Sequence, residues 1–334
     1  VHAGQLLTLA GSGPEEGPGT GAALDHLGLI RDGAVAVTDG LIVQVGPTTD
    51  VLDAVPQAAD VVDAAGRVVL PGFVDAHTHL LFAGSRAEEF ELRLRGATYQ
   101  EIAARGGGIL HTVTQTRLMS ERGLVDIGLA RLNRLLAHGT TTVEAKSGYG
   151  LSTEEELKLL RALHRLNALH QVDVIPTFLG AHAVPPEFAG DPDGYVHQVI
   201  EEMLPAVAAE DLAEFCDVFC EPDAFTLEQS RAILETGAEY GFVPKIHADE
   251  FSDSGGARLA AEVGAISADH LLYASAEGLR AMAEADTMAV LLPGTAFFLG
   301  LPAPAARRMI DLGVAVALAT AFTPGSSPTY SMQM

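Results

Sequence analysis

Two histidines, His77 and His79, end a run of mostly apolar residues that begins after Pro71 and Gly72. Alternate residues of a strand project to the same face, so these two imidazoles would point in one direction. Imidazole nitrogens a few ångströms apart suit a divalent metal ion. The spacing therefore predicts part of a metal site at the end of a buried strand.

Two later apolar segments also end in imidazoles, at His247 and His270. His247 is the natural third metal ligand. Glu250 follows it by three residues, where a carboxyl group could move protons to and from a leaving nitrogen. His270 could be a further ligand, or an imidazole that polarises the substrate.

Eight short apolar segments, separated by helical patterns, would position these side chains. We predict strands at residues 68–76, 140–145, 172–179, 215–221, 243–248, 265–269, 288–292 and 314–319. Helices are predicted between them, for example over 124–138 and 154–169. This alternation predicts an α/β protein with a (β/α)8 TIM barrel, in which catalytic groups lie at the carboxyl ends of the strands. An open doubly wound sheet is the alternative, although no glycine-rich dinucleotide fingerprint follows any of these strands.

The first part of the chain has a different pattern. Residues 33–46 alternate around Asp39-Gly40, which indicates a β-hairpin. We therefore predict a small, incomplete β domain over residues 1–67, the barrel over 68–322, and an active-site loop over 323–334 at a truncated C-terminus.

Acidic residues outnumber basic ones, 44 to 20, which gives a formal net charge of −24. Such a surface repels phosphate backbones and anionic lipid, so we expect a small-molecule substrate and neither nucleic acid nor membrane as a partner. The two cysteines, Cys216 and Cys220, are expected to be ordinary buried thiols. A reducing compartment suits them, so we expect a cytoplasmic protein.

The segments PGFVDAHTH (71–79), KIHADE (245–250) and SADH (267–270) resemble those of the amidohydrolase superfamily. Within it, HTHLLFAGSRAEEFELRLRGATYQEIAARGGGI, EAKSGYGL, FLGAHAVPPE and TPGSSPT are similar to the imidazolonepropionase family. The resemblance runs over almost the whole chain. It implies hydrolysis of the cyclic amide of 4-imidazolone-5-propanoate to N-formimino-L-glutamate, in histidine degradation, by a metal-activated water.

The resemblance also implies the site residues. One divalent metal, zinc or iron, would be held by His77, His79 and His247, and the resemblance is compatible with a homodimer. Glu250 and His270 would be catalytic. The implied substrate-binding residues are Arg86, Tyr149, His182, Glu250, Thr323, Gly325 and Ser326.

The residue types support these roles. Arg86 can bind a carboxylate through two parallel hydrogen bonds, which the propanoate group requires; the alternative is an ion pair with Glu88 or Glu89. Tyr149 could donate to a ring carbonyl or simply pack its loop, and His182 could bind substrate or be structural. Lys146 also lies at a strand end, where a carboxylated lysine bridging two metals is the minor alternative to a single ion.

The eighth predicted strand departs from the pattern of the family that the chain resembles. Ala321 and Thr323 stand where the resemblance implies an aspartate ligand and an asparagine. This leaves open a catalytically impaired or non-catalytic relative. The other alternative is a ring aminohydrolase of the nucleobase deaminase type, which would need no arginine for a carboxylate.

Overall fold

The computed structural model describes residues 1–11, 17–55, 60–96 and 107–334. It divides into two compact units, Val1–Gly72 and Phe73–Met334. The larger unit carries all the residues predicted to act in the site.

The first unit is built on a four-stranded sheet in the order β3-β2-β1-β4. Its elements are β1 (Ala3–Leu7), η1 (Gly21–Asp25), β2 (Leu29–Thr38), β3 (Leu41–Pro47), α1 (Thr48–Ala54) and β4 (Val68–Val69). The predicted hairpin is confirmed: β2 and β3 pair antiparallel. Asp39 and Gly40 take positive φ angles of 51° and 80°, as a two-residue turn between twisted strands requires.

The second unit holds an eight-stranded sheet in the order β12-β11-β10-β9-β8-β7-β6-β5. Its strands are β5 (Phe73–Thr78), β6 (Thr140–Lys146), β7 (Asp173–Ala181), β8 (Phe215–Cys220), β9 (Val243–Ala248), β10 (Ser267–His270), β11 (Met288–Leu291) and β12 (Val316–Leu318). Neighbouring strands pair in parallel. A parallel bridge between Thr78 and Ala321 joins the two ends of the sheet. The (β/α)8 barrel is thus confirmed.

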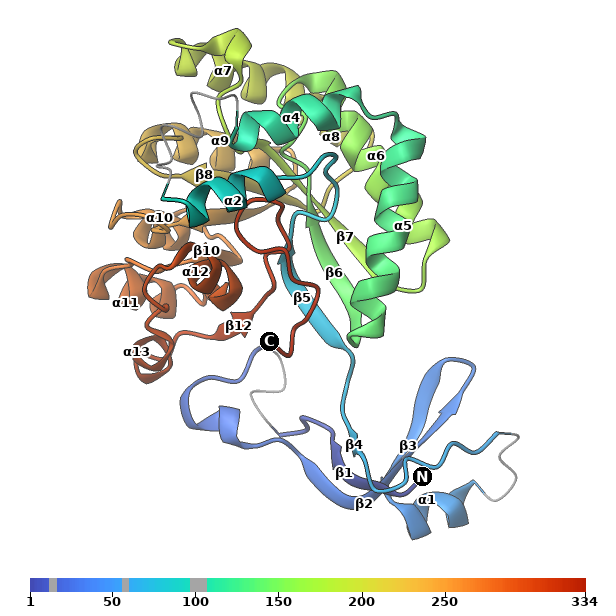
Figure 1. The fold of residues 1–334 in the computed structure, drawn as a ribbon. Coiled ribbons are helices and arrows are strands. Elements are labelled where there is room, and N and C mark those ends of the chain that lie inside the picture. The colour runs from blue at the N-terminus through green and yellow to red at the C-terminus, as the bar shows by residue number, and fades with distance from the viewer. Residues whose placement is uncertain (12–16, 56–59, 97–106) are drawn as a thin grey trace. The chain divides into compact units, whose positions relative to one another are not determined.

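Helices surround this barrel (Figure 1). The helical segments described are α2 (Ala87–Leu94), α4 (Ile109–Leu118), α5 (Glu121–Ala137), α6 (Thr153–Leu169), η2 (Pro186–Phe188), α7 (Pro192–Gln198), η3 (Val199–Met203), α8 (Leu204–Ala209), α9 (Leu227–Glu239), α10 (Gly256–Glu262), α11 (Ala276–Glu284), α12 (Pro293–Leu299) and α13 (Ala306–Asp311). On α6 the buried Leu159, Leu163 and Leu166 recur at three- and four-residue steps, which forms one apolar face. Among the described helices, none combines the length and the apolar character needed to cross a membrane.

The predicted strand over residues 68–76 is wrong. The run 68–76 is two strands, because β4 pairs with β1 in the small sheet whereas β5 begins the barrel at Phe73. Pro71 has no N–H to donate to a ladder, so pairing ends there. The other seven predicted strands are strands of the barrel, with ends shifted by at most two residues.

Candidate metal centre and active site

Three histidines meet at one end of the barrel. His77 lies on β5, His79 directly follows it, and His247 lies on β9. One ring nitrogen from each falls within 4.8 Å of the others, and all three side chains are buried. The two strands that carry them are far apart in sequence, so only closure of the barrel brings this set together.

Two of these rings each have a carboxylate at their Nδ1 atom. Asp269 Oδ2 lies 2.6 Å from Nδ1 of His77, and Asp217 Oδ1 lies 3.1 Å from Nδ1 of His247. Burial alone would raise the pKa of Asp217, but His247 and Lys146 hold it below its usual value. The ionised carboxylate accepts, so Nδ1 of His247 carries the proton and Nε2 presents a lone pair.

Within the described part of the chain, each of the three histidines keeps one buried ring nitrogen free of hydrogen bonds, as a metal ligand must. Nε2 of His77, Nδ1 of His79 and Nε2 of His247 are buried, and none has a hydrogen-bond partner among the described residues. Burial lowers the pKa of both His77 and His79. The positive charge of Lys146 contributes next to the lowered pKa of His77, and His182 contributes next for His79. Neutral imidazoles with free lone pairs are the form that binds a divalent cation, so these residues fit one.

His270 and Glu250 lie beside the cluster. The His270 ring centroid is 5.5 Å from that of His77 and 5.3 Å from that of His247. Oε1 of Glu250 approaches Nδ1 of His270 at 3.3 Å. Burial raises the pKa of Glu250 to about 8, with a further contribution from Glu221. Burial, and then His247, lower the pKa of His270. A protonated carboxyl group therefore faces a neutral imidazole near neutral pH.

The backbone is strained where these two residues are presented. Asp249 and His270 both have positive φ, 50° and 78°. Such conformations persist in non-glycine residues only where the surroundings fix them. Asp249 fixes its loop by accepting from the N–H groups of Ser254, Gly256 and Ala257. Glu221 accepts from the N–H of Phe251, and both contacts flank Glu250.

The predicted contacts Tyr149 and His182 lie beside His79, and Thr323 contacts Tyr149. The His182 ring stacks on His79, with centroids 4.9 Å apart and planes inclined by 12°. Nδ1 of His182 donates to the Gly148 carbonyl at 2.9 Å. Burial, with a further contribution from His247, lowers the pKa of His182 to about 3. Tyr149 Oη lies 3.1 Å from Thr323 Oγ1, and burial raises the Tyr149 pKa to about 12. These three side chains therefore offer neutral polar groups.

Arg86 and Gly325 lie next to each other. A Cβ atom at Gly325 would overlap the guanidinium of Arg86. Nε and Nη2 of Arg86 donate to Oε2 of Glu89, and Arg93 donates to the Gly325 carbonyl at 2.8 Å. The ion pair with Glu89 that the sequence left open is present. Ser326 is half-buried in the same turn, which Thr323 and Ser327 close through paired backbone hydrogen bonds.

Ala321 stands where the family resemblance implies an aspartate ligand. Its carbonyl accepts from the N–H of His79 at 3.2 Å, so its backbone adjoins a predicted metal ligand. Its φ is 65°, and its side chain packs in a small apolar cluster with Val290, Leu292 and Ala319.

Lys146, the alternative candidate for a bridge between two metals, donates to two carboxylates. Its Nζ lies 2.7 Å from Glu144 Oε1 and 2.7 Å from Asp217 Oδ2. The cluster of three histidines is the one potential metal group found in the part of the chain that the structure describes.

The sequence analysis did not single out the carboxylates behind the predicted ligands. Asp217 interrupts the apolar strand Phe215–Cys220, and Asp269 directly precedes His270. Glu156 was not predicted either. It fixes the loop around Tyr149 by accepting from the N–H groups of Gly148, Gly150 and Leu151. The usable signal was an acidic residue within a buried strand, because a fully buried carboxylate needs a specific partner.

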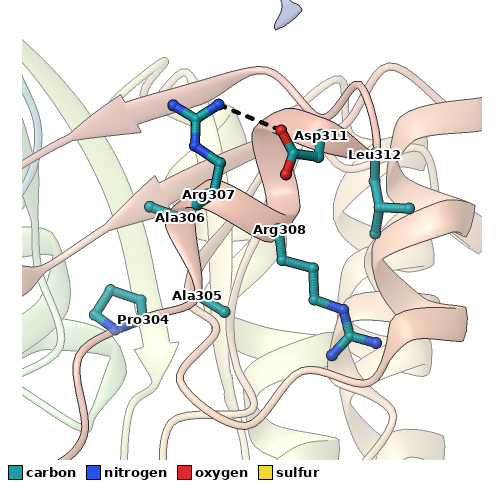
Figure 2. A pocket seen from close by; sticks show the side chains of 7 residues that line it. All are labelled: Pro304, Ala305, Ala306, Arg307, Arg308, Asp311 and Leu312. Atoms are coloured by element: carbon teal, nitrogen blue, oxygen red, sulfur yellow. Dashed lines mark hydrogen bonds and ion pairs between the residues drawn. The ribbon is translucent and has the colours of Figure 1, made fainter.

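Figure 2 shows a surface hollow around α13, lined by Pro304, Ala305, Ala306, Arg307, Arg308, Asp311 and Leu312. Arg307 and Asp311, one turn apart on α13, form an ion pair at 3.3 Å. None of its lining residues belongs to the histidine cluster, so we do not assign the chemistry to it.

Comparison with known proteins agrees with the histidine cluster. Residues 60–109 match the model of the amidohydrolase family. The imidazolonepropionase of Symbiobacterium thermophilum is 57% identical over 336 residues, which cover 99% of this chain and 78% of that one. The imidazolonepropionase of Geobacillus kaustophilus is 54% identical, with 100% and 79% covered.

Solved structures show the same fold at much lower identity. A 5-methylcytosine deaminase from Klebsiella pneumoniae superposes with a TM-score of 0.64 and 15% identity, over 96% of this chain and 76% of that one. The guanine deaminase of E. coli gives 0.60 and 16%, over 98% and 75%. At such identity the likeness concerns the fold alone, whereas identity above half over the whole chain is decisive. The chain belongs to the imidazolonepropionase family.

Proposed function

We propose that this chain hydrolyses the ring amide of 4-imidazolone-5-propanoate to N-formimino-L-glutamate, a step of histidine degradation. The observation that carries the proposal is the 57% identity to an imidazolonepropionase over 99% of the chain. The histidine cluster with its unsatisfied buried nitrogens supports it, because this reaction class needs an activated water.

His77, His79 and His247 would hold one divalent ion, zinc or iron, since imidazole nitrogens suit both. When bound, such an ion polarises the scissile carbonyl and makes water a stronger nucleophile at neutral pH. Asp269 and Asp217 orient two of the ligands from behind, which fixes their tautomers.

Glu250 would handle the proton that the reaction transfers. Hydrolysis forms a carbon–oxygen bond from water, breaks the ring carbon–nitrogen bond, and moves one proton from water to the leaving nitrogen. A carboxyl with a pKa of about 8 is protonated at neutral pH and can donate to that nitrogen. Glu250 regains its proton from the attacking water, so overall one proton passes from water to the leaving nitrogen. His270, neutral and adjacent, would donate a hydrogen bond to the carbonyl oxygen.

Arg86 would bind the propanoate carboxylate. The protein is strongly acidic overall, so an anionic substrate needs a dedicated cation. Glu89 accepts from Nε and from one N–H of Nη2, which leaves the second N–H of Nη2 and the two N–H groups of Nη1 for the substrate. Tyr149, His182, Thr323, Gly325 and Ser326 would line the space between this cation and the metal ligands.

Deamination of a nucleobase is the competing activity. A neutral base has no carboxylate for Arg86, and the deaminases that share the fold do so at 15–16% identity. Sequence likeness at 54–57% therefore favours the imidazolonepropionase reaction.

The test uses the purified full chain, with its metal content measured. We expect loss of the ultraviolet absorbance of imidazolonepropanoate, abolished by a chelator and restored by zinc or ferrous ion. Ammonia released from guanine or 5-methylcytosine, without loss of imidazolonepropanoate, would reverse the choice.

A further inference from the structure

We propose that Lys146 is a positioning residue that sets the orientation of two metal ligands at once. This role rests on the metal site of the proposed function. Among the described residues the lysine forms no hydrogen bond with either ligand; it acts through the two carboxylates behind them.

Lys146 is the last residue of β6, and its side chain is fully buried. Nζ donates to Asp217 Oδ2 at 2.7 Å and to Glu144 Oε1 at 2.7 Å. It also lies 3.7 Å from Asp269 Oδ2. One ammonium group therefore faces three buried carboxylates from three different strand positions.

Two of those carboxylates are hydrogen-bonded to the proposed metal ligands. Asp217 reaches Nδ1 of His247, and Asp269 reaches Nδ1 of His77, at 3.1 and 2.6 Å. Strands β5, β8, β9 and β10 are thus connected through a single cation on β6. A shift of Lys146 would be felt at both imidazoles.

The charges explain why a cation is required at this point. Without Lys146, the carboxylates of Glu144, Asp217 and Asp269 would repel one another in a site closed to water. Oδ2 of Asp217 would then lose its 2.7 Å partner and keep the longer contact with His247 Nδ1, at 3.1 Å, so Asp217 could turn. The imidazole would lose both its fixed tautomer and its fixed direction.

Lys245 provides a matched comparison inside the same barrel. It is also buried, and its Nζ bonds Ser267 Oγ at 2.7 Å. It lies 3.7 Å from Asp269 and has no contact with Asp217 among the described residues. Lys245 therefore supplies nearby positive charge without joining the two ligands.

The experiment compares Lys146→Met with Lys245→Met in the full chain, using Zn²⁺ alone as the probe. The dissociation constant is measured by competition with a chromophoric chelator. Loss of an outer partner of a metal ligand typically weakens affinity about 10–100-fold, and we expect this for Lys146→Met. Lys245→Met should change it less, and Lys158→Met, on the outer helix α6, should leave it unaltered.

A second readout reports ligand geometry without activity. The visible spectrum of the Co²⁺-loaded protein should change in Lys146→Met and stay as in the wild type in Lys158→Met. If Lys146→Met does not fold, Lys146→Gln retains a neutral donor on a side chain one atom shorter and should give an intermediate loss of affinity.

Wild-type Zn²⁺ affinity and an unchanged Co²⁺ spectrum in a folded Lys146 variant would overturn the proposal. Equal losses in the Lys146 and Lys245 variants would do so too, because they would show that only buried charge matters. A wild-type chain that binds no Zn²⁺ would instead overturn the metal site of the proposed function, and this role with it.

Discussion

Glu89 and Arg86 form a paired contact in which Nε and Nη2 both donate to one carboxylate oxygen, at 2.9 and 2.7 Å. The other oxygen of Glu89 accepts from the Gly108 N–H at 2.8 Å. The guanidinium is thereby fixed against the turn that contains Gly325. An ion pair and a substrate role are compatible, since the pair orients the arginine.

This relationship predicts that Arg86→Lys damages catalysis. A lysine cannot donate to Glu89 and to a carboxylate in the planar arrangement of a guanidinium. Losing one charge-assisted hydrogen bond costs about 1.5–3 kcal/mol, roughly ten- to hundredfold in kcat/KM. Steady-state kinetics on imidazolonepropanoate provide the measurement.

Arg95→Lys is the control, because Arg95 pairs with Glu91 on the exposed side of the same segment. Its kinetics should equal those of the wild type. If the Arg86 variant is as active as the Arg95 variant, Arg86 does not bind the propanoate.

The proposed metal ligands give a prediction that can be tested without substrate. His77→Ala and His79→Ala each remove one of three imidazoles, so most of the bound metal should be lost. Elemental analysis after dialysis measures the metal-to-protein ratio. His138→Ala changes an exposed histidine at the end of α5 and should retain the wild-type ratio. Full metal content in the His77 or His79 variant would reject the site.

Much of this candidate site could be predicted because the proposed ligands lie at the ends of strands. His77 and His247 close buried apolar runs, and barrel topology places all such ends on one face. The sequence also predicted the hairpin at Asp39-Gly40, since that turn depends on two adjacent residues.

Side-chain pairing at long range could not be predicted. Asp269 lies 192 residues from the His77 it orients, and Lys146 lies 71 residues from Asp217. No local pattern encodes which buried acid meets which base. The misplaced strand 68–76 has a similar cause: both halves are apolar, and only pairing with different sheets separates them.

Glu250 predicts a dependence of stability on pH in the metal-free protein. Its pKa rises from 4.5 to about 8 on folding, so the folded state holds this proton more tightly than the unfolded state. The stabilisation is present below about pH 4.5 and is lost as pH rises through 8. Each unit is worth about 1.4 kcal/mol, so several kcal/mol are at stake.

Glu250→Gln keeps the shape and removes the titration. Urea unfolding at pH 6 and pH 9 should show a smaller loss of stability in this variant than in the wild type. The exposed Glu88→Gln serves as the control and should follow the wild type. Parallel curves for the Glu250 variant and the wild type would contradict a buried, protonated carboxyl at this position.

A substitution at Ala321 is predicted to increase metal affinity. Its φ of 65° costs an alanine about 1–2 kcal/mol, whereas aspartate and asparagine are enriched several-fold in this conformation. Its carbonyl accepts from the N–H of His79, so a carboxylate introduced at this position starts beside a metal ligand. We expect Ala321→Asp to raise metal affinity by supplying a fourth ligand.

The same carboxylate could accept a proton from the attacking water. General-base assistance typically contributes about 10²–10⁴-fold, so turnover should rise as well. Ala321→Asn is the matched control, because it relieves the backbone equally and carries no charge. Zn²⁺ affinity and kcat at saturating metal are compared for the three proteins. Equal gains in the Asp and Asn variants would assign the effect to the backbone, and no gain in the Asp variant would remove position 321 from the metal site.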